Sequence, residues 1–132
     1  MKFTNEYIEM VSKAEEIQGL WKINEGNWFV YNGTNGKYEK LNPFCSTFAN
    51  EIKPYMREYY SWLPTLDDLF GMVEGDVIDK LDSFYDWVVV DCTNVILLNN
   101  LVDMKEFLLC YVMFDKFNKH WHPDKHQWEA IK

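Results

Sequence analysis

The sequence has 132 residues, of which 48% are hydrophobic and 17% aromatic. This length and composition exclude a disordered chain, and they predict one ordered domain over residues 1–132 whose core needs no disulfide or metal. The formal net charge is −8. A negative chain with dispersed lysines and a single arginine argues against direct binding to nucleic acid, because the phosphate backbone would be repelled.

The first ten residues, MKFTNEYIEM, lack the continuous apolar core of a secretory signal. The most apolar stretches, near residues 87–92 and 95–98, are interrupted by polar groups, so no membrane segment and a cytoplasmic location are expected. Cys45, Cys92 and Cys110 show no CxxC spacing and favour reduced, mostly buried thiols. A nucleophilic cysteine paired with a histidine is the less favoured alternative.

Two patterns organise the N-terminal half. Apolar residues recur at helical spacing from Phe3 to about Trp21, which predicts an amphipathic helix. The run NWFVYNGTNGKYEKL then predicts a β-hairpin over residues 28–41, because Asn and Gly tolerate the positive φ of a tight turn. Its GTNG lacks the Lys-Ser/Thr of a phosphate loop, so a turn is favoured there.

Residues 42–60 admit two interpretations. Apolar spacing indicates a helix, but Pro54 disfavours one, and extended chain over residues 55–62 is preferred. The following stretch, SWLPTLDDLFGM, predicts a helix start, because Thr65 and Asp68 have the spacing of a capping box. Asp67 and Asp68 would point about 100° apart on that helix, so they do not form a catalytic pair. The residues expected to pack inward are Leu66, Leu69, Phe70, Met72 and Val73.

Residues 76–88, DVIDKLDSFYDWV, predict a helix with two distinct faces. One face gathers Val77, Ile78, Leu81, Phe84, Tyr85 and Val88, and the opposite face carries aspartates. A solvated outer face is the ordinary interpretation of such acids. The alternative is a face that binds Lys and Arg on a nucleic-acid-binding protein. The residues of this acidic stripe, which are the candidate partner-binding residues, are Glu74, Asp76, Asp79, Asp82 and Asp86.

The next segment, WVVVDC, is rich in β-branched residues and predicts a strand before Asn94, followed by a short buried segment or loop at VILLNN. Asp103 and Glu106 have the spacing of a second capping box. They predict the start of a long helix that ends near Lys119. Methionine and aromatic residues at helical spacing in this helix favour a core role over a cofactor pocket.

All three histidines, His120, His122 and His126, lie in the tail KHWHPDKHQWEAIK. Their spacing matches neither a zinc finger nor a helical HExxH site, so no metal, no cofactor and no catalytic residue is assigned. The Pro-Asp pair favours a turn. A terminal hairpin is therefore predicted, with Trp121 and Trp128 packing on the core.

Three motifs stand out: WLPTxDDLxxM at residues 62–72, FYDW at 84–87 and the final MKEFLLCYVMFDKFNKHW with a second tryptophan beyond it. Together they resemble small accessory proteins of bacterial phages and prophages. The resemblance covers about residues 56–132, and the region NVILLNNLVD departs from it. The matching residues have structural character, and they are Trp62, Pro64, Asp68, Leu69, Met72, Trp87, Trp121 and Trp128.

The resemblance implies a non-enzymatic phage-type protein in a bacterial host cytoplasm that inhibits a host defence or nucleic-acid-processing protein, in the manner of anti-CRISPR proteins. A host nuclease with a basic groove would be one such partner, and a homodimer is compatible with the sequence. The predicted fold is a single α+β domain with a small mixed or antiparallel sheet packed against several helices. The alternatives are a nucleotide-binding module with an aromatic-lined pocket and a metal hydrolase that uses the three histidines.

Overall fold

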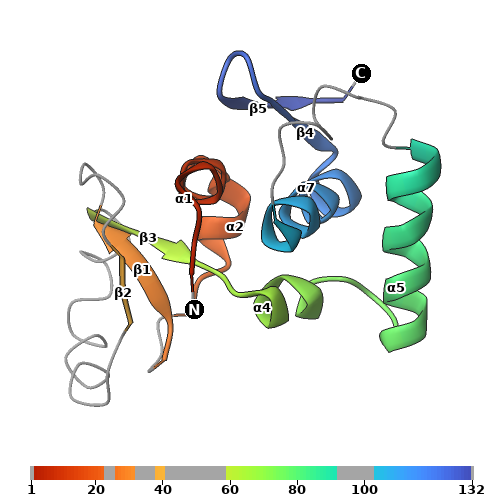
Figure 1. The fold of residues 1–132 in the computed structure, drawn as a ribbon, viewed down its shortest axis with the longest axis horizontal. Helices are drawn as coiled ribbons and strands as arrows, with labels where there is room; N and C mark the ends of the chain where they lie inside the picture. The colour runs from red at the N-terminus through yellow and green to blue at the C-terminus, as the bar shows by residue number, and fades with distance from the viewer. Residues whose placement is uncertain (1, 23–25, 32–37, 41–58, 92–102, 132) are drawn as a thin grey trace. The chain divides into compact units, whose positions relative to one another are not determined.

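The computed structural model describes residues 2–22, 26–31, 38–40, 59–91 and 103–131 (Figure 1). The chain forms two compact units, residues 1–64 and residues 65–132. Each unit combines helices with an antiparallel sheet, which confirms the predicted α+β class and the antiparallel form of sheet. A single domain over residues 1–132 stays a prediction.

The N-terminal unit begins with two short helices, α1 (Asn5–Ser12) and α2 (Glu15–Gly19). The predicted helix from Phe3 to Trp21 is therefore interrupted, because Ala14 has a non-helical backbone and starts the second helix. The apolar periodicity nevertheless gives the buried residues correctly except for Leu20, since the break leaves Ala14 itself in the core. The buried set is Tyr7, Ile8, Met10, Val11, Ala14, Ile17 and Trp21, whereas Leu20 is exposed.

A three-stranded antiparallel sheet completes this unit, with strand order β2-β1-β3. Strands β1 (Trp28–Tyr31) and β2 (Tyr38–Lys40) form the predicted hairpin, and its turn lies outside the described residues. Strand β3 (Tyr60–Leu63) pairs with β1 and confirms the extended prediction at its C-terminal end. Tyr59 is helical, so the extended prediction is wrong at that residue, and its remaining part and the rest of the helical alternative fall on residues 41–58, which the structure does not describe.

The amide of Gln18 joins α2 to the outer edge of β3. Its Nε2 donates to the carbonyls of Val11 and Trp62 at 2.9 and 3.0 Å, and its Oε1 accepts from the Trp62 N–H at 2.7 Å. One side chain thus satisfies backbone groups of an edge strand that would otherwise need another strand or water. The Tyr7 hydroxyl adds a buried hydrogen bond to the Pro64 carbonyl at 2.6 Å.

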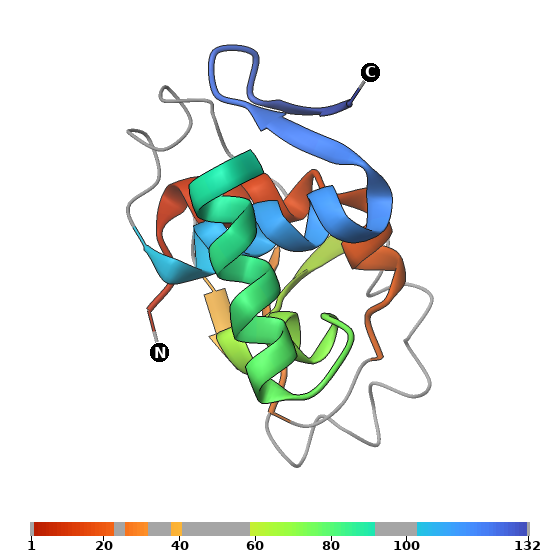
Figure 2. The same cartoon turned by 90° about the vertical axis from the view of Figure 1, so that its right-hand side faces the viewer.

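The C-terminal unit contains α4 (Leu66–Gly71), α5 (Val77–Asp86), the π-helix η1 (Trp87–Asp91) and α7 (Met104–Phe117). Capping boxes start α4, α5 and α7, which confirms the two boxes predicted at Thr65 and Asp103 and adds one at Asp76. Helix α7 ends at Asn118, whose left-handed backbone (φ 54°) closes the last turn. In the view of Figure 2, α5 crosses α7 steeply.

The strand predicted from Trp87 is wrong, because residues 87–91 form η1. The backbone N–H of Trp87 donates to the Ser83 and Phe84 carbonyls, so the chain continues to coil beyond α5. Trp87 is also buried among aromatic rings of α7, and this tertiary packing overrides the β-propensity of the valines. The predicted VILLNN segment lies outside the described residues.

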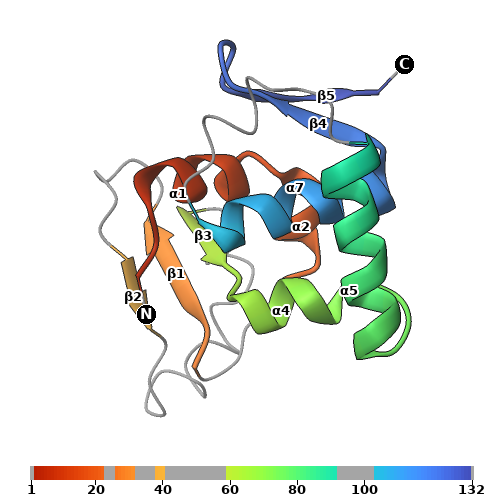
Figure 3. The ribbon, with the colours of Figure 1, turned by 45° about the vertical axis from the view of Figure 1, so that its right-hand side comes forward.

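The unit closes with a two-stranded hairpin, β4 (Lys119–His122) and β5 (Gln127–Ala130), which follows α7 directly (Figure 3). Trp121 and Trp128 are cross-strand partners with ring centroids 5.2 Å apart. Trp121 is buried and Trp128 is half-buried, so the predicted hairpin is confirmed and Trp121 is its main anchor.

Cys110 lies buried in α7, as predicted, and Cys45 and Cys92 fall outside the described residues. Across the described ranges, no helix has both the length and the apolar character needed to cross a membrane.

Replacing Gln18 with Glu should destabilise the N-terminal unit by about 1–3 kcal/mol at pH 7, since a carboxylate cannot donate to the two carbonyls. Urea denaturation followed by circular dichroism measures this. Glu15→Gln, an exposed change on the same helix, should alter the free energy of unfolding by less than about 0.5 kcal/mol. Equal effects of the two variants would mean that the Gln18 bonds do not stabilise the sheet edge.

Candidate functional site

Aromatic packing fixes α5 against α7. Ring centroids of Phe84 and Trp87 each lie 5.6 Å from Tyr111, and Trp87 lies 6.1 Å from Phe114. Trp87 is only 5% exposed. Burial raises the pKa of Tyr111, with the nearby Asp115 charge adding to the effect, so its phenol stays neutral within the cluster. Phe84 and Trp87 therefore mark the side of α5 that packs against α7.

Because α5 packs on α7 through Phe84 and Trp87, most of its predicted apolar face is exposed to solvent. Val77, Ile78, Leu81 and Tyr85, here called the apolar arc, are 59%, 65%, 50% and 66% exposed, and no residue of α5 is buried. An amphipathic helix usually buries its apolar face, but these four residues of the predicted face are exposed. The reason is geometric: the centre of the arc lies roughly a quarter turn around the helix from the Phe84–Trp87 line, at about 100° per residue.

A groove of about 660 Å³ lies beside the apolar arc, entirely within the C-terminal unit. Helix α4 contributes Leu66 and Phe70, and α7 contributes Met104 and Leu108. The segment from α5 into η1 contributes Leu81, Phe84, Tyr85 and Val88. The polar lining residues are Asp67 and Asp82, so the described lining carries two carboxylates and no basic group.

The packing of α4 leaves part of this lining open. Leu69 and Val73 are buried as predicted, whereas Phe70 and Met72 are half-buried and Leu66 is exposed, against the inward expectation. The neighbouring acids of α4 have separate surroundings, as their spacing predicted. Asp68 accepts the Thr65 N–H at 2.8 Å in the capping box, and Asp67 lines the groove.

The acidic stripe divides into three kinds of residue. Asp76 and Asp79 form the capping box of α5, with the Asp79 N–H donating to Asp76 at 2.9 Å. Glu74 precedes the helix and pairs with Lys116 of α7 at 3.2 Å. Asp82 and Asp86 are exposed, and Asp82 also lines the groove. Asp82 therefore joins the acidic stripe to the groove, and Asp86 extends the charge one turn further.

Sequence reasoning found the acidic stripe but missed the groove. The groove depends on residues from three helices, and no local pattern gives the rotation of α5 that exposes Leu81 and Tyr85. The apolar face of residues 76–88 has an ordinary width for an amphipathic helix, so it gave no signal that part of it stays exposed.

A second polar cluster surrounds Glu129 on the terminal hairpin. Its Oε1 accepts from Gln127 Nε2 at 3.0 Å and Lys125 Nζ at 3.1 Å, and His120 Nε2 lies 3.7 Å from Oε2. The hydrogen bond from Gln127 and then that from Lys125 lower the pKa of Glu129 to about 2. His122 adds a weaker charge effect. This exposed arrangement stabilises the carboxylate and, by itself, defines no substrate position.

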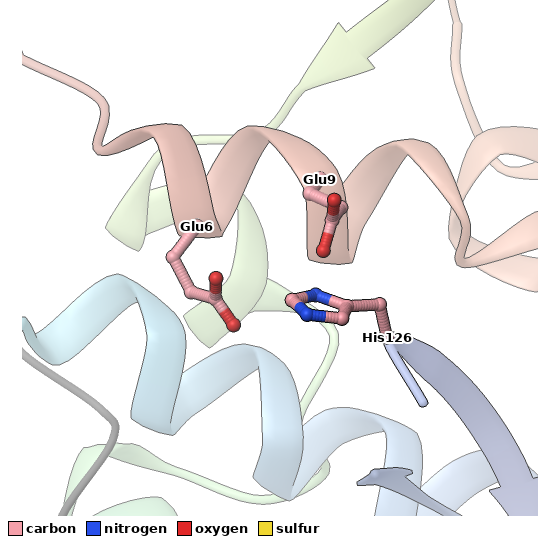
Figure 4. Close-up of side chains that lie close together, drawn as sticks. All are labelled: Glu6, Glu9 and His126. Carbon is pink, nitrogen blue, oxygen red and sulfur yellow. The ribbon is translucent and has the colours of Figure 1, made fainter. Parts of the chain in front are cut away.

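The three histidines do not converge. His120 and His122 lie on β4, and His126 lies in the turn with positive φ. Figure 4 shows His126 on the hairpin, and it shows Glu6 and Glu9 leaving α1 on one side of the helix. The glutamates belong to the N-terminal unit and the histidine to the C-terminal unit. Among the described residues, no metal-sized group of ligand atoms includes His120 or His122.

Replacing Trp87 with Ala should destabilise the C-terminal unit by about 3–5 kcal/mol, because a large buried aromatic side chain is lost. The near-ultraviolet circular dichroism signal and the urea midpoint should both fall. Val89→Ala, which truncates an exposed side chain two residues away, should leave both nearly unchanged. A Trp87 variant as stable as the wild type would show that the aromatic cluster does not hold α5.

Glu129 should make stability depend on acid pH. Its pKa is lower in the folded state than the ordinary 4.5, so its contribution is fully present above pH 4.5 and is lost as the pH falls toward 2. The difference in free energy of unfolding between the wild type and Glu129→Gln should shrink over that range at low salt. A difference that stays constant between pH 5 and pH 2.5 would contradict this assignment.

A scan against models of protein families finds no match to this chain. Searches of curated proteins and of solved structures also find no match.

Proposed function

We propose that this protein acts by binding another protein, as a non-enzymatic inhibitor of a host defence or nucleic-acid-processing protein. The observation that carries the proposal is the exposed apolar arc of α5, which borders an apolar groove and the carboxylates of Asp82 and Asp86. Contiguous apolar surface with a charged rim is typical of a protein interaction site. The phage-type origin and the bacterial cytoplasm belong to the same proposal.

The net negative charge of the chain predicts that the partner presents a basic surface. A chain with a net charge of −8 is attracted to basic surfaces, and nucleic-acid-processing proteins use such surfaces to hold phosphate backbones. Asp82 and Asp86 would face Lys or Arg of the partner, and burial of the apolar arc would slow dissociation. Occupation of a basic cleft would then exclude the nucleic acid that normally binds there.

A nucleotide-binding module is the alternative that one observation favours, since Phe70, Phe84 and Tyr85 line the groove and could stack on a base. Its weakness is electrostatic, because Asp67 and Asp82 would repel the phosphates of a nucleotide. A nucleotide panel in a thermal-shift assay separates the two, because a bound ligand raises the melting temperature. A metal hydrolase that uses His120, His122 and His126 is the least supported of the three functions, because these histidines do not converge.

Reversing Asp82 and Asp86 to Lys should abolish partner binding while the fold is retained, because both side chains are exposed. Asp79 is left unchanged, because its carboxylate caps α5. The protein is used as bait in a lysate of a bacterial host that carries a related phage. Retained proteins are identified by mass spectrometry, and the principal one is assayed for inhibition of its nuclease or nucleic-acid-binding activity.

The matched control is Glu15→Lys with Asp124→Lys, which makes the same change in net charge at exposed positions that do not belong to α5. The control should retain the partner, and binding of the wild type should weaken as salt is raised. Equal retention by the wild type and the Asp82/Asp86 variant would remove this face from the proposal. A captured protein whose activity is unaffected would contradict inhibition.

A further inference from the structure

We propose that the groove of the C-terminal unit receives a basic amphipathic helix of the partner protein. This inference rests on the proposed function and names the element of the partner that is recognised. A groove bounded by helices, with an apolar floor, is the geometry in which an amphipathic helix binds by its apolar face. The floor here is built from α4, α5 and α7, and its volume of about 660 Å³ suits several apolar side chains.

The spacing of the exposed residues sets the length of this partner helix. Ile78, Leu81 and Tyr85 are separated by three and four residues, so they form one row along α5. From Ile78 to Tyr85 the row spans about 10 Å at 1.5 Å per residue. A partner helix of three turns, with apolar residues at i, i+3 or i+4 and i+7, presents a row of similar length.

The carboxylates that line the groove predict a positively charged partner helix. Asp67 comes from α4 and Asp82 from α5, so acids from two different helices line the groove. Lys or Arg beside the apolar row of the partner could lay its hydrocarbon stem on the floor and bring its charge to these carboxylates. Lys80 is the nearby cation on α5, and its Nζ lies 5.1 Å from the centre of the Phe70 ring.

The same charges disfavour other occupants. A second copy of this chain would bring its own Asp67, Asp82 and Asp86 into the contact, and like charges repel. An anionic membrane surface or a phosphate backbone would meet the same carboxylates. A cationic helix satisfies both the apolar floor and the acidic lining.

Synthetic peptides test this directly. The probe is a 14-residue peptide of Leu and Lys with Leu at helical spacing, labelled at its N-terminus, and fluorescence anisotropy measures its affinity. The controls are the same composition in scrambled order and a version with Glu in place of Lys. The amphipathic Lys peptide should bind at least tenfold more tightly than either control, and its affinity should fall as salt rises.

Variants of the full chain locate the site. Leu81→Lys should weaken binding of the Leu/Lys peptide at least tenfold, because it places a cation on the groove floor. Leu20→Lys makes the same substitution at an exposed leucine of the N-terminal unit and should have no effect. Circular dichroism of both variants verifies that they are folded. Equal binding by the two variants, or equal binding of the ordered and scrambled peptides, would overturn the inference.

Further outcomes separate this inference from the proposed function. Concentration-dependent dimerisation that Leu81→Lys abolishes would assign the groove to a second copy and overturn it. Loss of partner capture by the Asp82/Asp86 variant, with no binding of the Leu/Lys peptide, would leave the proposed function standing and reject the helix. Peptide binding at the groove without capture of an inhibited host protein would support the helix and reject the proposed function.

Discussion

The packing of Phe84 and Trp87 against Tyr111 determines which face of α5 the C-terminal unit exposes. These rings lie at one edge of the apolar surface of α5 rather than at its centre, so the helix is held with Leu81 and Tyr85 outward. The π-helix η1 begins at Trp87, and its wider turn changes the direction of the side chains beyond α5. If α5 packed on α7 through the centre of its apolar surface instead, the apolar arc would be buried. The groove would then lose the wall that Leu81 and Tyr85 provide.

Acidic residues of this unit serve two separate purposes. Asp68, Asp76, Asp79, Asp103 and Glu106 take part in capping boxes, where each box satisfies backbone N–H groups that a helix start leaves unpaired. Glu106 is fully buried in that role. Asp67, Asp82 and Asp86 do not belong to these boxes. The two acids that line the groove, Asp67 and Asp82, are thus acids that cap no helix.

Local chemistry made much of the fold predictable. Thr65 and Asp68, or Asp103 and Glu106, specify a helix start within four residues, and Pro-Asp in the tail specifies a turn, so these elements follow from short segments alone. The rotation of α5 and the π-helix at Trp87 depend on Tyr111, more than twenty residues away. The pattern of residues 76–88 gave the right helix and the right acidic face, but the wrong environment for Val77, Ile78, Leu81 and Tyr85.

The exposed arc and the acids beside it are best understood together. Four large apolar side chains exposed on one side of a helix would promote association between copies of the chain, because burial of such surface is favourable. Asp82 and Asp86 oppose that outcome, since two copies meeting at this face would bring four carboxylates together in a dry contact. The same carboxylates do not oppose a cationic partner. A surface that disfavours its own copy and accepts a basic helix has selectivity from charge and affinity from apolar contact.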